Sequence, residues 1–103
     1  MQYSNKLNVA KKQKKLEIIR SKLDKLDNSL LSLIKYRTSL VKEVLKLKEF
    51  KKEIVDNKRI KFILKKIQIK SKKLNIDPKI TKRIWKNMIW SYIDYERRNF
   101  KKK

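Results

Sequence analysis

The sequence predicts an all-α protein built from one long and two shorter helices. Its 103 residues include no glycine and a single proline, so residues that interrupt a helix are almost absent. Apolar residues recur at spacings of three and four, whereas the alternation typical of strands is rare. We expect a chain of this length to form one domain with a thin core.

The long helix is predicted from about residue 12 to about residue 48, after a polar, frayed segment at residues 1–11. One face carries an apolar stripe typical of a helix that packs against other helices. The stripe consists of Leu16, Ile19, Leu23, Leu26, Leu30, Leu33, Leu40, Val44 and Leu47. At 1.5 Å per residue the helix would be about 55 Å long, which exceeds the expected width of a compact domain of this size. We therefore expect a second copy of the chain to pack along it.

Two capping signals divide the rest of the chain. Residues 49–55 are predicted to form a loop, and Asp56 is a suitable N-cap for the second helix. That helix is predicted to end near Asn75, a residue that tolerates the left-handed conformation. Asp77 and Pro78 then supply an N-cap and a first-turn proline for the third helix. The apolar residues of these two helices are Ile60, Ile63, Leu64, Ile67 and Leu74, and then Ile80, Ile84, Trp85, Met88, Ile89, Tyr92, Ile93 and Tyr95.

Missing residue types exclude several kinds of chemistry. Without cysteine there is neither a disulfide framework nor a thiolate metal site, and without histidine the usual general base and metal ligand are absent. No apolar run approaches the roughly 20 residues that span a bilayer. The N-terminus lacks the apolar core of a signal peptide. We expect a soluble, cytoplasmic protein with no metal site.

The formal net charge is +22, from 32 basic and 10 acidic residues. Such a charge is typical of proteins that bind nucleic acid or anionic membranes. It also follows from codon drift in an AT-rich genome, because the basic residues are mainly lysine and both isoleucine and asparagine are abundant. We favour the second interpretation, since nucleic-acid readers prefer arginine. Under either interpretation, the positive electrostatic field of the protein attracts small anions.

Arg37 occupies the stripe position between Leu33 and Leu40 where an apolar residue is expected. A guanidinium stays charged, and burying it unpaired is costly, so an anion from the protein or from a ligand should meet it. Lys48 follows on nearly the same azimuth, about 16 Å along the axis, and both long side chains can converge on one anion. Arg20 lies about 25 Å before Arg37, so it can join that site only from an antiparallel partner chain.

Further candidates lie on the two shorter helices, and each also has a purely structural interpretation. Glu96 continues the apolar face of the third helix, and Arg59 opens the second helix three residues after Asp56. Arg37 can form a buried ion pair with Glu96 or Asp27. Arg59 can be a surface residue or a partner of Asp56. Arg20 and Lys48 can simply be solvated surface residues, and Trp85 and Tyr92 can be ordinary core residues.

One set of spaced residues runs through all three predicted helices. It consists of Leu16, Arg20, Asp24, Asp27, Leu30, Leu31, Arg37, Lys48, Asp56, Arg59, Asn75, Ile76, Asp77, Pro78, Trp85, Met88 and Ile89. Its spacing resembles that of the small all-helical chorismate mutases, over about residues 14–99. The resemblance implies an intertwined homodimer of three-helix chains with two active sites. We place the mutase-like domain at residues 14–100, between a flexible basic segment at residues 1–13 and a basic tail at residues 101–103.

The resemblance also implies roles for the candidate residues. Arg20 would reach into the partner's site, Arg37 would hold a substrate carboxylate, and Lys48 would donate to the ether oxygen of chorismate. Glu96 would stand where the family has Gln or Glu for the same oxygen. Further pocket positions match Asp56, Arg59, Ile60 and Tyr92. The implied reaction, chorismate to prephenate in aromatic amino acid biosynthesis, is a pericyclic rearrangement that needs no nucleophile, metal or cofactor.

Ile60 departs from the pattern, because typical mutases of this family carry Glu there to meet the substrate hydroxyl. An apolar residue at this position, with an aromatic at Tyr92, is similar to the related isochorismate–pyruvate lyases, which release salicylate and pyruvate. We favour the mutase as the commoner activity, with the lyase as the alternative. A non-catalytic basic helical binding module is a second alternative. Arg37 argues against nucleic-acid binding, because it lies on the core stripe and not on a solvent face.

Overall fold

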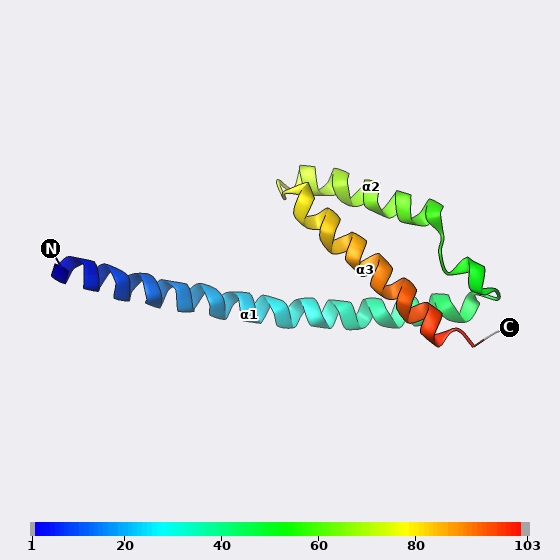
Figure 1. Ribbon diagram of the computed structural model, residues 1–103, viewed down its shortest axis with the longest axis horizontal. Coiled ribbons are helices and arrows are strands. Elements are labelled where there is room, and N and C mark those ends of the chain that lie inside the picture. Colours follow the sequence, from blue (N-terminus) through cyan, green and yellow to red (C-terminus); the bar gives the residue numbers. More distant parts are fainter. Residues whose placement is uncertain (1, 102–103) are drawn as a thin grey trace. The chain divides into compact units, whose positions relative to one another are not determined.

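The computed structural model describes the backbone of residues 2–101 and the side chains of residue 6 and residues 8–101. The described residues form three α-helices, which are labelled in Figure 1, and a short 3₁₀ helix. The elements in order are α1 (Gln2–Leu47), η1 (Lys51–Glu53), α2 (Asn57–Lys73) and α3 (Pro78–Asn99). The described residues contain no strand, so the prediction of an all-α chain with three α-helices is confirmed.

α1 starts earlier than predicted and ends where it was expected. It begins at Gln2, well before residue 12, because no glycine or proline interrupts residues 2–12 and most of these residues favour helix. It ends at Leu47, next to the predicted end. Neither α1 nor another helix among the described residues is long and apolar enough to cross a membrane. Three residues of the two predicted terminal segments, Met1, Lys102 and Lys103, lie outside the described residues.

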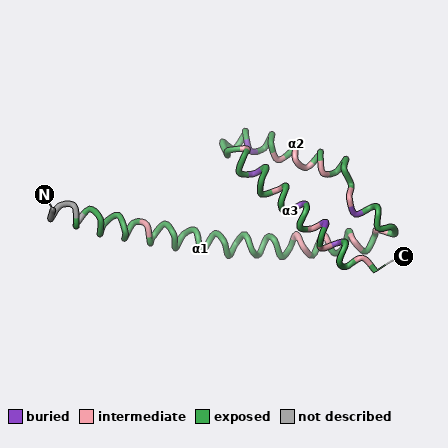
Figure 2. The backbone as a smooth tube through the Cα atoms, viewed as in Figure 1, coloured by how far each residue is buried: buried purple, intermediate pink, exposed green. Residues whose placement is uncertain are grey.

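The chain divides into two compact units, residues 1–39 and residues 40–103. The described part of the first unit is the portion of α1 up to Ser39, and Figure 2 shows the described side chains there as almost wholly exposed. Most of the predicted apolar stripe lies on this surface, with Leu23, Leu26 and Leu30 each more than half exposed. The last part of the stripe, from Leu40 on, belongs to the second unit. A continuous apolar surface of this kind is typical of a protein–protein contact.

The second unit is built around the contact between α2 and α3, which pack side by side (Figure 1). Its core consists of Ile54, Ile89 and Ile93. Partly buried side chains pack against this core, namely Val55, Ile60, Ile63, Leu64 and Phe100. Ile54 belongs to the predicted loop at residues 49–55, yet it is only 3% exposed. The loop is therefore anchored in the core at its far end.

Both predicted capping signals are confirmed. The Asp56 carboxylate accepts the backbone N–H of Arg59 at 3.0 Å, as an N-cap of α2. The Asp77 carboxylate accepts the backbone N–H of Lys79 at 2.9 Å, as the N-cap of α3. Asn75, between the two helices, has a φ of 56°, the left-handed conformation expected at the end of α2.

The predicted apolar faces of α2 and α3 are partly wrong. Leu74 is 69% exposed, and Ile80 and Ile84 are also exposed. Ser71 and Thr81 are buried instead, with their hydroxyl oxygens 2.7 Å apart. Helical periodicity marks apolar positions, whereas small hydroxyl residues that bond to each other allow two helices to approach closely. That pairing is a tertiary contact that periodicity does not reveal.

Candidate functional site

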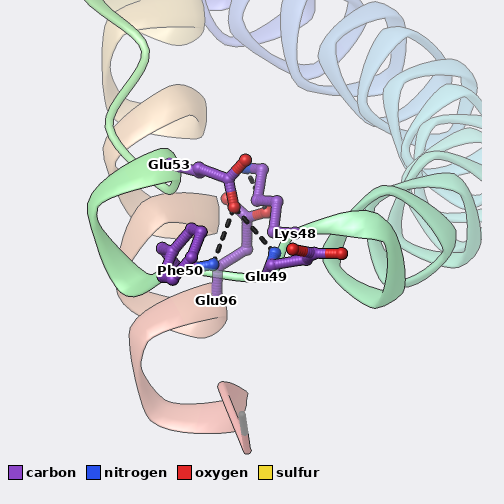
Figure 3. Close-up of polar contacts among 5 residues, drawn as sticks. All are labelled: Lys48, Glu49, Phe50, Glu53 and Glu96. Carbon is purple, nitrogen blue, oxygen red and sulfur yellow. Dashed lines mark hydrogen bonds and ion pairs between the residues drawn. The ribbon is translucent and has the colours of Figure 1, made fainter. Parts of the chain in front are cut away.

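Lys48 and Glu96 form an ion pair that joins two distant parts of the second unit. The Lys48 Nζ lies 2.8 Å from the Glu96 Oε1, and the two side chains are only 18% and 7% exposed. Lys48 is the residue after the last residue of α1, and Glu96 lies in the last turns of α3 (Figure 3). The structure therefore brings together two of the residues that sequence analysis predicted for one site.

Glu96 is buried because it continues the core face of α3. Ile89 and Ile93, at helical spacing before it, are both in the core. A carboxylate on such a face is costly unless a cation and hydrogen bonds compensate for lost water. The Lys48 ammonium supplies both, through a charge-assisted hydrogen bond. The pair is far more buried than the ion pair of Arg98 and Asp94 on the surface of α3.

The ion pair can present hydrogen-bond donors to an oxygen atom of a ligand. An ammonium has three N–H donors, and Glu96 accepts one of those of Lys48. The remaining donors are available to an acceptor, in partly buried surroundings where hydrogen bonds are electrostatically stronger than in water. Glu96 itself accepts when ionised and donates only when protonated.

Asp56, Arg59 and Ile60 lie at the start of α2, where the structure gives them different surroundings. Asp56 is tied to the backbone of Arg59 as the helix cap. The Arg59 guanidinium is exposed and lies 5.4 Å from the centre of the Phe62 ring. Ile60 is half-buried and packs against the core cluster. The side chain at position 60 therefore offers no hydrogen bond.

The remaining predicted residues lie elsewhere in the chain. Tyr92 is half-buried on α3, one turn before Glu96. Arg20 and Arg37 belong to the first unit, where Arg20 is exposed and Arg37 is half-buried. That the two arginines take part in a site with Lys48 stays a prediction.

Glu53 binds the backbone directly after Lys48, and sequence analysis did not single it out. Its Oε2 accepts the backbone N–H groups of Glu49 and Phe50, each at 2.7 Å. The N–H of Phe50, then that of Glu49, and the charges of Lys48 and Lys52 hold the pKa of Glu53 below its usual range. One sequence signal could have revealed this contact, namely an acidic residue three positions after the residue that starts a turn. That is the spacing of a capping box.

A groove of about 610 Å³ lies between α2 and α3. Four lysines are among the residues that line it, Lys61, Lys65, Lys79 and Lys82, and neither Lys48 nor Glu96 lines it. The groove therefore belongs to the general positive surface and not to the ion pair. Among the described residues, no cluster of three or more acidic, histidine or cysteine side chains could hold a metal ion.

Comparison with known proteins places most of the chain in one family. The family model for chorismate mutase type II matches residues 19–97. A chorismate mutase of Methanocaldococcus jannaschii is 38% identical over 76 residues, which cover 73% of this chain and 77% of that protein. No solved structure matches the chain.

Proposed function

This chain belongs to the type II chorismate mutase family of isomerases, and on that premise we propose that it rearranges chorismate to prephenate. The observation that best supports the proposal is the buried pair of Lys48 and Glu96. The matched region includes both residues. The reaction belongs to the aromatic amino acid pathway, and we place it in the cytoplasm.

The mechanism that we propose relies on binding and electrostatics alone. Chorismate is a dianion whose ether oxygen gains negative charge in the transition state. Lys48 donates a hydrogen bond to that oxygen, and Arg37 holds a substrate carboxylate. Glu96 accepts from Lys48 in the ion pair, and it donates a second hydrogen bond to the ether oxygen only after it takes up a proton. Fixing the reactive conformer and stabilising the developing charge lower the barrier, with no nucleophile, metal or cofactor.

The same proposal includes an intertwined homodimer with two sites. The apolar stripe of α1 is exposed in the single chain, and the matching stripe of a second copy would cover it. Arg20 would then extend from one chain into the site of the other. Light scattering on the purified protein should give a mass of about twice one chain, and a monomer at micromolar concentration would contradict the dimer.

The remaining pocket positions would complete the substrate site. Asp56 orders the start of α2 as its cap, and Arg59 would place a further cation at the pocket edge. Tyr92 would lie against the substrate ring from α3. Ile60 packs toward the core and offers no hydrogen bond, so it cannot meet the substrate hydroxyl as a Glu would. This one observation favours the alternative function, an isochorismate–pyruvate lyase.

Product analysis separates the two functions. The purified protein is incubated separately with chorismate and with isochorismate, and prephenate, salicylate and pyruvate are measured. We expect prephenate from chorismate. Salicylate and pyruvate from isochorismate, without prephenate, would replace the mutase with the lyase. No turnover of either compound would contradict both enzymes and favour a basic helical binding module.

The pH dependence of the reaction tests the role of Glu96. We expect kcat/KM for chorismate to fall as pH rises, because Glu96 donates a hydrogen bond only when protonated. Glu96→Gln should give a flatter profile, since an amide donates at every pH. The control is Asp94→Asn, which removes an exposed carboxylate from the same helix and should keep the wild-type profile. If Glu96→Gln keeps the wild-type slope, the donor role is wrong.

A further inference from the structure

We propose that Glu53 is a positioning residue, which clamps the backbone after Lys48 and thereby fixes where the Lys48 ammonium lies. The proposal rests on the proposed function, because the position of that ammonium matters for the rate only if Lys48 acts on the substrate. Glu53 itself need not touch the substrate. It lies in the predicted loop, outside the residues that the family resemblance singled out.

The clamp consists of two short hydrogen bonds to consecutive backbone groups. The Glu53 Oε2 accepts the N–H of Glu49 and the N–H of Phe50, each at 2.7 Å (Figure 3). These are the two residues directly after Lys48. On the other side, the Lys48 N–H donates to the carbonyl oxygen of Leu45 at 3.2 Å. The backbone of Lys48 is therefore held by the helix before it and by the Glu53 carboxylate after it.

The core holds the clamp itself in place. Ile54 follows Glu53 directly and is 3% exposed, in contact with the α3 residues of the core cluster. A continuous series of contacts thus runs from the core through Glu53 to the backbone at Glu49, and from Lys48 to Glu96. Both ends of the loop are tied to α3, although the loop between them is exposed.

The chemistry of the clamp requires an ionised carboxylate. Hydrogen bonds from backbone N–H groups to a charged acceptor are stronger than bonds between neutral groups. The same two N–H groups keep the pKa of Glu53 below its usual range, so the carboxylate stays ionised near neutral pH. Without the Glu53 carboxylate, both N–H groups would form hydrogen bonds to water instead, and the loop would become more mobile. A displacement of the catalytic group by about 1 Å can cost up to about 10²-fold in rate.

Three variants test the clamp in the full-length protein. Glu53→Ala removes it, Glu53→Gln keeps one neutral acceptor, and Glu49→Gln is the control, because Glu49 contributes only its backbone N–H to the clamp. We expect Glu53→Ala to lower kcat for chorismate about tenfold with little change in KM, and Glu53→Gln to lose less. The control should stay within about twofold of wild type. A purely structural role would lower the thermal midpoint and leave kcat of the folded protein unchanged.

Chemical labelling of Lys48 provides a readout that is independent of activity. Acetic anhydride acetylates accessible amines, and peptide mass spectrometry compares Lys48 with Lys42, an exposed lysine of α1. In the wild type Lys48 should react more slowly than Lys42, and in Glu53→Ala its rate should rise toward that of Lys42. If the wild type is active, the proposal is contradicted when Glu53→Ala changes kcat but not the labelling rate of Lys48. It is also contradicted when the variant changes the labelling rate but not kcat. If the wild type turns over no chorismate, the proposed function fails, and an unchanged labelling rate in Glu53→Ala overturns the clamp separately.

Discussion

Replacing Lys48 with methionine should lower kcat/KM for chorismate about 10³-fold. Methionine keeps most of the length and volume of the lysine and removes only the charge and the donors. The ether oxygen would then gain negative charge without an ammonium beside it. Because this contact strengthens in the transition state, the loss should appear mainly in kcat.

The same replacement leaves the Glu96 carboxylate without its ion-pair partner. Its side chain is 7% exposed, and an unpaired buried carboxylate destabilises the fold. Lys48→Met combined with Glu96→Gln should therefore recover the thermal midpoint without recovering the rate. Lys42→Met is the matched control, because Lys42 is exposed on α1, six residues before Lys48. If Lys48→Met retains more than about a tenth of the wild-type kcat/KM, Lys48 is not the principal donor.

Replacing Arg37 with methionine should raise KM for chorismate about 10²-fold or more and also lower kcat. An arginine holds a carboxylate through two parallel hydrogen bonds, and losing one partner of such a pair typically costs 2–5 kcal/mol, or about 30- to 5,000-fold. Arg37→Lys should recover only part of the affinity, since an ammonium lacks the planar fork.

The control for Arg37 is Arg83→Met, which removes the same charge from an exposed position on α3. It should leave both kinetic constants close to those of wild type. Steady-state kinetics at fixed ionic strength checks the comparison, because the net charge of +22 attracts a dianion in every variant. If both replacements changed KM and kcat equally, Arg37 would contribute only to the overall positive electrostatic field of the protein.

The ends of the shorter helices could be predicted because their signals are local. Asp56 and Asp77 each bond to a backbone N–H within three residues, and Asn75 adopts its conformation alone. The faces of the helices were harder to predict, as Leu74 shows. Which apolar residues become buried depends on how α2 meets α3, and the buried hydroxyls of Ser71 and Thr81 bond to each other in that contact.

The site could be predicted only in part, for similar reasons. Lys48 and Glu96 are 48 residues apart, and helix geometry alone did not pair them; the family resemblance assigned both to one substrate oxygen. Glu53 was missed because a carboxylate that accepts two backbone N–H groups leaves no periodic pattern. Arg20 and Arg37 stay predictions, since the role of Arg20 depends on a second copy of the chain and Arg37 belongs to the first unit, apart from Lys48 and Glu96 in the second.

Subunit mixing tests most directly whether the site is a mutase site built from two chains. Arg20→Ala and Lys48→Met chains, each nearly inactive alone, are mixed in equal amounts in urea and refolded together. Half of the dimers then contain one chain of each kind, and each mixed dimer has one intact site, with Arg20 from one chain and Lys48 from the other. We expect prephenate formation at about one quarter of the wild-type rate. A rate no greater than the mean of the two variants alone would contradict the shared site.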